Sequence, residues 1–244
     1  MQAAAYVRPG ATARPTEDEV RRRRRLTTWV AVRTRFLDEV VTDACNGPCR
    51  QVVIVGAGLD ARAFRLAWPS GTRLWELDLA EVLAFKEMVV QAEEWVPRCE
   101  RIPVDVDLSR NWGERLEATG FDAHAPVVWL AEGLLAYLSA AARDSLISSM
   151  AELSIPGSRM GVTLAAPQRL DEWRKDHPDG AANPGDNVAL WQSTAPDDPS
   201  GWLAQLGWEA ALFGVAERAG AYGRPLDSVD HGKNGAHLVD ATRS

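Results

Sequence analysis

Acidic side chains follow successive apolar segments of this sequence. Asp78, Asp107 and Glu132 each come at or just after the end of a predicted strand, and Asp60 follows a glycine turn. Because open α/β sheets bind ligands at the carboxyl ends of their parallel strands, we expect these carboxylates to gather at one edge of a sheet. A carboxylate can accept hydrogen bonds from both hydroxyls of a ribose, and Asp78, 22 residues after Gly56, suits that role. The spacing therefore predicts a site for a nucleotide-type cofactor.

Residues 51–62, QVVIVGAGLDAR, are the stretch that should position this site. The apolar run at 52–55 predicts a central parallel strand buried on both faces. The Gly-Ala-Gly turn at 56–58 lets the backbone pass close to a ligand, where a Cβ atom would clash. A helix beginning near Asp60 would point its N-terminal N–H groups and its positive dipole end at that ligand. Asp60 can serve either as the N-cap of that helix or as a ligand-binding group.

Strands and helices alternate along most of the chain. A Thr-x-x-Glu capping box at residues 16–19 starts a long helix, whose apolar stripe includes Arg33. A charge on that stripe needs a partner, and Glu132 is one candidate. The short connections predict a doubly wound parallel sheet. The predicted strands are 51–56, 72–77, 99–104, 126–131, 159–165, 208–215 and 236–241, with helices near 60–67, 79–94, 111–119, 139–153 and 199–206.

We expect one domain that carries a long insertion. For 244 residues a single full-sized core is the default, with residues 1–50 as an N-terminal arm and helix packing on the core of a cofactor-binding domain, 51–244. Residues 167–198 are rich in Pro, Gly, Asp and Asn, which favours a lid. Trp173 and Trp191 in this insertion fit a flat or hydrophobic small-molecule acceptor, or they pin the lid to the core.

The bulk composition narrows the class of protein and its partners. The apolar fraction of 46% and charged fraction of 25% are those of an ordinary globular protein. The net charge of −7 argues against general nucleic-acid affinity. No apolar run approaches a membrane span and the N-terminus lacks the apolar core of a signal peptide, so we expect a cytoplasmic protein with no membrane partner. Three cysteines give neither a disulfide framework nor a zinc set, and we expect no metal.

From the glycine turn alone, an NAD-dependent oxidoreductase remains an alternative function. The dinucleotide fingerprint Gly-x-Gly-x-x-Gly has Ala61 at its third glycine here, which weakens that interpretation. The strands near 208–215 and 236–241 follow five α/β units, as expected of a seven-stranded methyltransferase sheet whose final strand runs antiparallel.

Four ordered blocks carry a family resemblance: VVIVGAGLDARAFRL, WELDLAEVLAFKE, DVDL and WLAEGLLAYLS. Together they resemble the leucine carboxyl methyltransferase family, and more closely its bacterial branch of S-adenosylmethionine-dependent O-methyltransferases. The resemblance covers residues 26–166 well and 200–243 loosely. It implies a doubly wound, seven-stranded class I methyltransferase (Rossmann-like) sheet with an N-terminal helix and a lid insertion. It also implies S-adenosyl-L-methionine as the cofactor.

The resemblance also implies roles for single residues. Arg33 would hold the methionine carboxylate of the cofactor by a bidentate pairing, and Glu132 its amino end. Asp78 would take the ribose hydroxyls, and Asp107 with Leu108 the adenine. Together with the residues beside these positions, the predicted cofactor-binding set is Arg33, Gly56, Ala57, Gly58, Asp60, Asp78, Leu79, Asp107, Leu108, Glu132 and Gly133. The catalytic candidates are Tyr137, which matches a family tyrosine near the substrate, and His177, a histidine of the insertion.

The acceptor is expected to be a small molecule, aromatic or carboxylate-bearing, such as a natural product. A carboxylate acceptor is already ionised and needs no general base, whereas a hydroxyl acceptor is helped by one. His177 in the insertion is the best candidate base; the other histidines are His124, His231 and His237. Family members usually carry a longer segment before the first strand, so we expect the insertion to cover more of the pocket or the pocket to be more open. Two further alternatives remain: the protein binds the cofactor without catalysis, or it forms a homodimer.

Overall fold

The computed structural model describes residues 16–177, 187–225 and 236–244. Its centre is a seven-stranded sheet in the order β3-β2-β1-β4-β5-β7-β6, in which only β7 runs antiparallel to its neighbours. The predicted doubly wound sheet with an antiparallel last strand is therefore confirmed. The strands are β1 Gln51–Val55, β2 Arg73–Asp78, β3 Glu100–Asp105, β4 Val127–Ala131, β5 Arg159–Ala165, β6 Trp208–Gly214 and β7 Ala236–Arg243.

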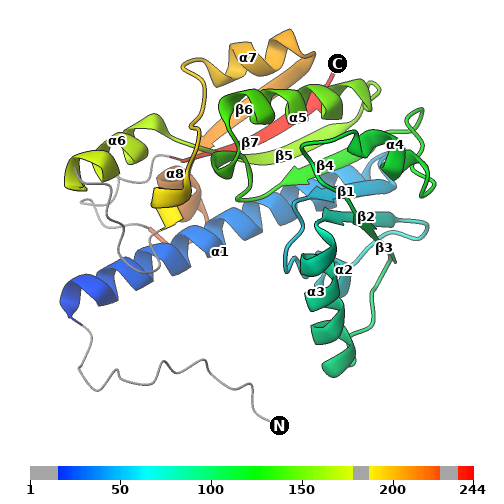
Figure 1. Ribbon diagram of the computed structural model, residues 1–244, viewed down its shortest axis with the longest axis horizontal. Helices are drawn as coiled ribbons and strands as arrows, with labels where there is room; N and C mark the ends of the chain where they lie inside the picture. Colours follow the sequence, from blue (N-terminus) through cyan, green and yellow to red (C-terminus); the bar gives the residue numbers. More distant parts are fainter. Residues whose placement is uncertain (1–15, 178–186, 226–235) are drawn as a thin grey trace.

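The helices cover both faces of the sheet (Figure 1). In the view of Figure 1, α1 runs along the lower face while α5 and α7 lie above the sheet. The helices are α1 Glu17–Asn46, α2 Arg62–Arg65, α3 Ala80–Ala92, α4 Trp112–Glu117, α5 Ala140–Glu152, α6 Pro167–Asp176, α7 Pro199–Gln205 and α8 Val215–Ala221, with short 3₁₀ turns η1 Leu135–Tyr137 and η2 Asn187–Leu190. None of the described helices is long and apolar enough to cross a bilayer.

The alternation of side chains along β1 feeds two cores. Val53 and Val55 join the core beneath α4, α5 and α7, while Val52 and Ile54 join the core that α1 completes. At the crossing of α1 with β5, a Cβ on Gly161 would come within 2.8 Å of Leu37 Cδ2. Glycine at this position therefore lets α1 lie close against the sheet, which places the side chains of α1 beside the strand ends.

Three expectations about local structure need correction. The helix after the glycine turn is a single turn, Arg62–Arg65, instead of residues 60–67. The insertion predicted as an irregular lid opens with a helix, α6, which has Pro167 at its first turn and buries Leu170. The strand predicted to end at 215 ends at Gly214, because Val215 and Ala219 turn inward and form a buried face of α8 against α1.

The second half of the insertion is fastened to the sheet edge. The backbone N–H groups of Gln192 and Ser193 donate to the Ala136 carbonyl, and the N–H of Ala195 donates to the Ala165 carbonyl. These bonds hold residues 192–195 across η1 and the end of β5, on the side where the parallel strands terminate. Residues 178–186 of the predicted lid and His231 lie outside the described residues.

Candidate functional site

The glycine turn is tied to the end of β2. The N–H groups of Gly56 and Ala57 donate to the Leu77 carbonyl, and the N–H of Gly58 donates to Asp78 Oδ2 at 2.7 Å. The other oxygen of Asp78 accepts from the Leu79 N–H at 2.8 Å. Because each carboxylate oxygen has two lone pairs, both oxygens of Asp78 keep acceptor capacity while the side chain is held against the turn.

The two glycines of the turn differ in what surrounds them. Both have positive φ, +65° at Gly56 and +48° at Gly58, which favours glycine. A Cβ on Gly56 would lie 3.0 Å from Leu134 Cδ1, so the chain itself fills the space there. Beyond Gly58 nothing lies within 4 Å of the Cβ position. The open approach to the turn is therefore at Gly58, next to the Asp78 carboxylate.

Glu132, which follows β4, is held between two arginines. Its Oε1 accepts from Arg33 Nε of α1 and its Oε2 from Arg62 Nη2, both at 2.7 Å. Burial raises the pKa of Glu132, but the charges of Arg62 and Arg33 outweigh it and the pKa is lowered overall. The carboxylate is therefore ionised near neutral pH. The ion pair between Arg33 and Glu132, one of the two alternatives for the charge on the apolar stripe, is present.

Arg62 joins the carboxylates of three separate elements. Its side chain is 1% exposed, and it pairs with Glu132, with Asp38 of α1 at 2.9 Å, and with Asp60 of the glycine turn. Arg65 adds a bidentate pairing to Asp38. Three carboxylates thus meet the guanidinium groups of Arg33, Arg62 and Arg65, so the group is balanced in charge.

Asp60 is not the N-cap of α2, which is Ala61, but its carboxylate binds the first residue of that helix. Its Oδ1 accepts from the backbone N–H of Arg62 at 2.7 Å, and its Oδ2 from the Arg62 guanidinium. Burial raises the pKa of Asp60, and the charge of Arg62 counters only part of that rise. The N–H expected to face a ligand is therefore occupied by Asp60, and a direct contact of Asp60 with a cofactor stays a prediction.

The predicted adenine end lies at the surface beyond β3. Asp107 Oδ1 accepts from the backbone N–H and hydroxyl of Ser109, at 3.0 and 2.6 Å, and these bonds hold its pKa below the usual value. Leu108 is half-buried against the core beneath α4, α5 and α7, and Leu79 is 43% exposed. The order β3-β2-β1 places Asp107 beyond Asp78 as seen from the glycine turn. The adenine roles of Asp107 and Leu108 stay predictions.

Gly133 and Tyr137 follow Glu132 directly. Gly133 has φ +66°, its N–H donates to Thr163 Oγ1, and a Cβ there would come 2.9 Å from Arg33 Nη1. The glycine therefore makes room for the Arg33 side chain. Tyr137 is half-buried in η1, beneath the residues 192–195 that cross it.

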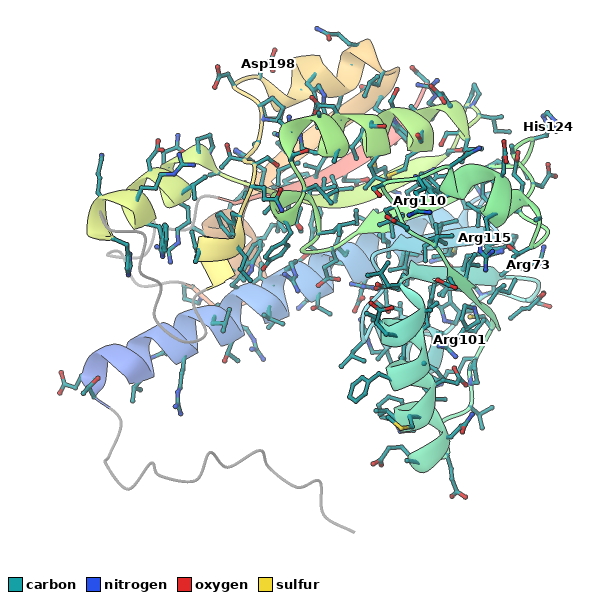
Figure 2. The ribbon with its side chains drawn as sticks, in the orientation of Figure 1. Arg73, Arg101, Arg110, Arg115, His124 and Asp198 are labelled. Carbon is teal, nitrogen blue, oxygen red and sulfur yellow. The ribbon has the colours of Figure 1, made fainter. Side chains whose placement is uncertain are left out.

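The three described histidines lie in different parts of the molecule. His124 lies at the outer margin of the molecule beyond α4, away from α6 (Figure 2). His177 ends α6, stacks on Trp173 at 4.8 Å and places Nδ1 3.0 Å from the Trp173 carbonyl oxygen. His237 begins β7 opposite Leu164, near the carboxyl end of β5. A general-base role of His177 stays a prediction, and the register makes His237 a second candidate.

Arg62 and Asp38 were absent from the predicted site. A charged residue two positions after Asp60 gives no periodic signal, and Asp38 lies beside the apolar stripe of α1, where a solvated side chain is the default. Arg33 and Asp38 are five residues apart, about 140° around the helix axis, so helical spacing gave no signal that both reach one site. The described residues hold no group of three or more His, Cys, Asp or Glu side chains arranged to bind a metal ion.

A separate hollow lies between α1 and α8. Its volume is about 250 Å³, and Arg35 stacks over the Tyr222 ring at 4.2 Å from the centroid. Burial raises the pKa of Tyr222 to about 12, and the hydrogen bond to Glu39 adds to the rise. The described lining contains none of the strand-end carboxylates, so this hollow is distinct from the candidate cofactor site. The lining residues are Ala31, Val32, Arg35, Tyr222 and Arg224.

Comparisons with known proteins agree with this arrangement. A family model described as leucine carboxyl methyltransferase matches residues 3–151. A protein of Frankia alni, provisionally named an S-adenosyl-L-methionine-dependent methyltransferase, is 46% identical over 239 residues, covering 97% of this chain and 82% of its own. A protein of Streptomyces coelicolor with the same provisional name is 45% identical over 230 residues, covering 93% and 80%.

Solved structures show the fold alone, because their sequences have diverged. Magnesium protoporphyrin IX methyltransferase of Synechocystis aligns with a TM-score of 0.60 at 14% identity, covering 95% of this chain and 90% of its own. A DUF574 family protein of Streptomyces avermitilis aligns with a TM-score of 0.58 at 12% identity, covering 91% and 83%. The sheet order and the strand-end site define a class I methyltransferase fold. Within that class, the chain belongs to the leucine carboxyl methyltransferase family.

Proposed function

We propose that this chain transfers a methyl group from S-adenosyl-L-methionine to an oxygen atom of a small-molecule acceptor. Family membership carries the coarser statement, that the chain is an S-adenosylmethionine-dependent methyltransferase. The proposal is supported most directly by a continuous series of contacts that joins the ends of three neighbouring strands to α1. The series runs from Asp78 to Gly58 of the glycine turn, and on through Asp60, Arg62 and Glu132 to Arg33.

The residues present fit the cofactor chemically. The adenosyl part needs acceptors for its ribose hydroxyls, and Asp78 supplies a fixed carboxylate with free lone pairs beside the open side of Gly58. The amino-acid part is a zwitterion and needs one cation and one anion, which Arg33 and Glu132 supply. When bound, S-adenosylmethionine supplies an electrophilic methyl group on a sulfonium.

The chain's own contribution to the reaction is alignment and exclusion of water. Residues 192–195 lie across η1, so they partly cover the side of the site that contains Tyr137. A carboxylate acceptor would need no proton removed, which suits a site whose nearest charged groups are already paired. A hydroxyl acceptor would need a base, for which His177 and His237 are the candidates. The description of the family as carboxyl methyltransferases supports oxygen as the methylated atom.

Two measurements test this function. Thermal-shift assays with S-adenosylmethionine, S-adenosylhomocysteine and NAD should show stabilisation by the first two alone. Labelled methyl transfer to matched panels of carboxylic acids, phenols and amines should then give product with the oxygen acceptors. A methyl ester releases methanol in base whereas a methyl ether does not, so base treatment distinguishes the two oxygen classes. Stabilisation by NAD alone, or transfer only to amines, would overturn the proposal.

A further inference from the structure

The two arginines that hold Glu132 differ in their access to solvent. Arg33 is 21% exposed and bonds Oε1, while Arg62 is 1% exposed and bonds Oε2. Thr34 Oγ1 lies 3.4 Å from Oε1 and adds only a long contact. One oxygen of Glu132 therefore faces an exchangeable partner and the other a permanent one.

Arg62 has no freedom to change partners. Nε donates to Asp38, Nη1 to Asp60 and Nη2 to Glu132, so each of its three nitrogens is bound to a carboxylate of a different element. Its backbone is fixed as well, because the carbonyl accepts from Trp68 Nε1 at 3.1 Å. Since a guanidinium has a rigid fork of donors, the position of Arg62 fixes the position of Glu132.

We propose that Arg62 is a positioning residue for the amino-acid end of the cofactor. It retains Glu132 at the end of β4 while Arg33 exchanges Glu132 for the cofactor's carboxylate, and the freed Oε1 of Glu132 accepts from the cofactor's ammonium group. This inference rests on the proposed function. The charges stay balanced, because the zwitterion brings one anion to Arg33 and one cation to Glu132.

The exchange predicts a selectivity that an arginine serving only the fold would not produce. A ligand with the amino-acid end, S-adenosylhomocysteine, can replace the Arg33–Glu132 ion pair on both sides. 5′-Methylthioadenosine has the same adenosyl thioether without the amino acid, so it leaves the pair unchanged. Loss of Arg62 should therefore weaken binding of the first ligand and spare the second.

The test compares calorimetric affinities of both ligands in the full chain. We expect Arg62→Gln to weaken S-adenosylhomocysteine binding by about tenfold or more, since a charge-assisted contact is misplaced, and to leave 5′-methylthioadenosine within about twofold. Arg62→Lys should fall between, because a lysine ammonium can satisfy fewer of the carboxylates. Arg65→Gln is the matched control: Arg65 contacts Asp38 of the same network without touching Glu132, so both affinities should stay within about twofold. Equal losses for both ligands, or unchanged affinities in both Arg62 variants, would overturn the inference.

A measurement on the wild-type chain covers the case in which the Arg62 variants do not fold. The arginine Nε–H signals can be followed by nuclear magnetic resonance during titration. S-adenosylhomocysteine should shift the signal of Arg33 and leave that of Arg62 in place, and 5′-methylthioadenosine should shift neither. A larger shift at Arg62 than at Arg33 would contradict the inference. If the wild type binds neither ligand, the proposed function fails; if it prefers S-adenosylhomocysteine and the preference is undiminished in both Arg62→Gln and Arg62→Lys, only this inference fails.

Discussion

Two clusters of charge, one at the carboxyl ends of the strands and one beside β2, differ in how their central carboxylate is held. In the site cluster, Glu132 gives one oxygen to each of two arginines. In the β2 cluster, Glu76 is 0% exposed and one oxygen takes both cations, Lys86 Nζ at 2.8 Å and Arg101 Nη2 at 2.9 Å. The site cluster is Arg33, Asp38, Asp60, Arg62 and Glu132; the β2 cluster is Glu76, Lys86, Glu87 and Arg101.

The comparison shows what makes a buried ion pair available for binding. Glu76 Oε1 and Arg101 Nε have no hydrogen-bond partner in the structure, yet no solvent reaches them, and the Lys86 contact is an ion pair without hydrogen-bond geometry. Both partners of Glu76 are buried, Lys86 at 4% and Arg101 at 5% exposed, so this carboxylate is closed to a ligand. Glu132 has one partly exposed partner, Arg33 at 21%, so the same chemistry is accessible to a ligand there. The predictions below test this division.

The largest effect is expected from the closed cluster. Glu76→Gln leaves Lys86 buried without an anion and Arg101 with Glu87 alone, so the free energy of unfolding should fall by about 3–5 kcal/mol. Urea denaturation measures this. Glu87→Gln removes the exposed member, 43% exposed, and should cost less than about 1 kcal/mol. Folded Glu76→Gln should keep its affinity for S-adenosylhomocysteine; a loss of binding would show that the clusters act together.

A smaller effect, on binding instead of folding, is expected at the glycine turn. Asp78→Ala removes the carboxylate beside Gly58, and S-adenosylhomocysteine affinity should fall by about 3 kcal/mol, roughly 100-fold, because two charged hydrogen bonds to the ribose are lost. Asp105→Ala is the control, since Asp105 is the register partner of Asp78 on β3 and its side chain is 54% exposed. Calorimetric titration of both variants with S-adenosylhomocysteine measures the two affinities. Wild-type affinity in Asp78→Ala would mean that the ribose lies elsewhere.

Arg33→Gln should weaken S-adenosylhomocysteine binding by about 10- to 100-fold while Glu132 keeps its bond to Arg62. The unfolding free energy should change little, because the exposed half of the pair is the one removed. Arg35→Gln, two positions along α1 and 59% exposed, is the matched control and should leave binding unchanged. If Arg33→Gln binds normally but unfolds easily, Arg33 is a structural residue and the division between the clusters is lost.

The next smaller effect is expected in the pH dependence of the unfolding free energy, to which the site cluster contributes. The charges of Arg62 and Arg33 lower the pKa of Glu132 below its ordinary 4.5, so the folded state favours the ionised form. The stability that ionised Glu132 contributes is therefore fully present above pH 4.5 and is lost as the pH falls through the lowered value. The difference in unfolding free energy between wild type and Glu132→Gln should be constant near neutral pH and close in acid. A difference that widens in acid would reverse the assigned sign.

The sequence predicted the carboxylates at the strand ends but not Arg62, the residue that joins the site. Asp78 and Glu132 were foreseeable because the apolar runs before them place any following carboxylate at the ligand-binding edge. Arg62 was not, because its burial depends on Asp38, Asp60 and Glu132, which only the folded chain brings together. A local sequence pattern contains no information about contacts between residues so far apart in the chain.

The C-terminal third contains two helices that were not predicted from the sequence. The helix α8 was predictable in principle, since Ala, Glu and Arg at 216–219 are strong helix formers, and Val215 and Ala219 bury its inner face against α1. The helix α6 was predictable in principle, since Pro167 at a first helical turn is a known start signal that the Gly- and Asn-rich residues after it obscured.

The smallest expected effect lies at the edge of the β2 cluster, on Cys99. Burial and the nearby charge of Glu76 raise the pKa of this thiol to about 11. Glu76→Gln removes the negative charge and should lower that pKa, so Cys99 should react severalfold faster with a thiol reagent at mildly alkaline pH, where the thiolate is the reacting form. Cys45, which is 1% exposed and has a pKa raised to about 12 by burial, is the internal control. Peptide mass spectrometry separates the two rates. If both rates rise together, the variant is opening globally; if that of Cys99 alone rises, the β2 cluster acts on its surroundings by charge.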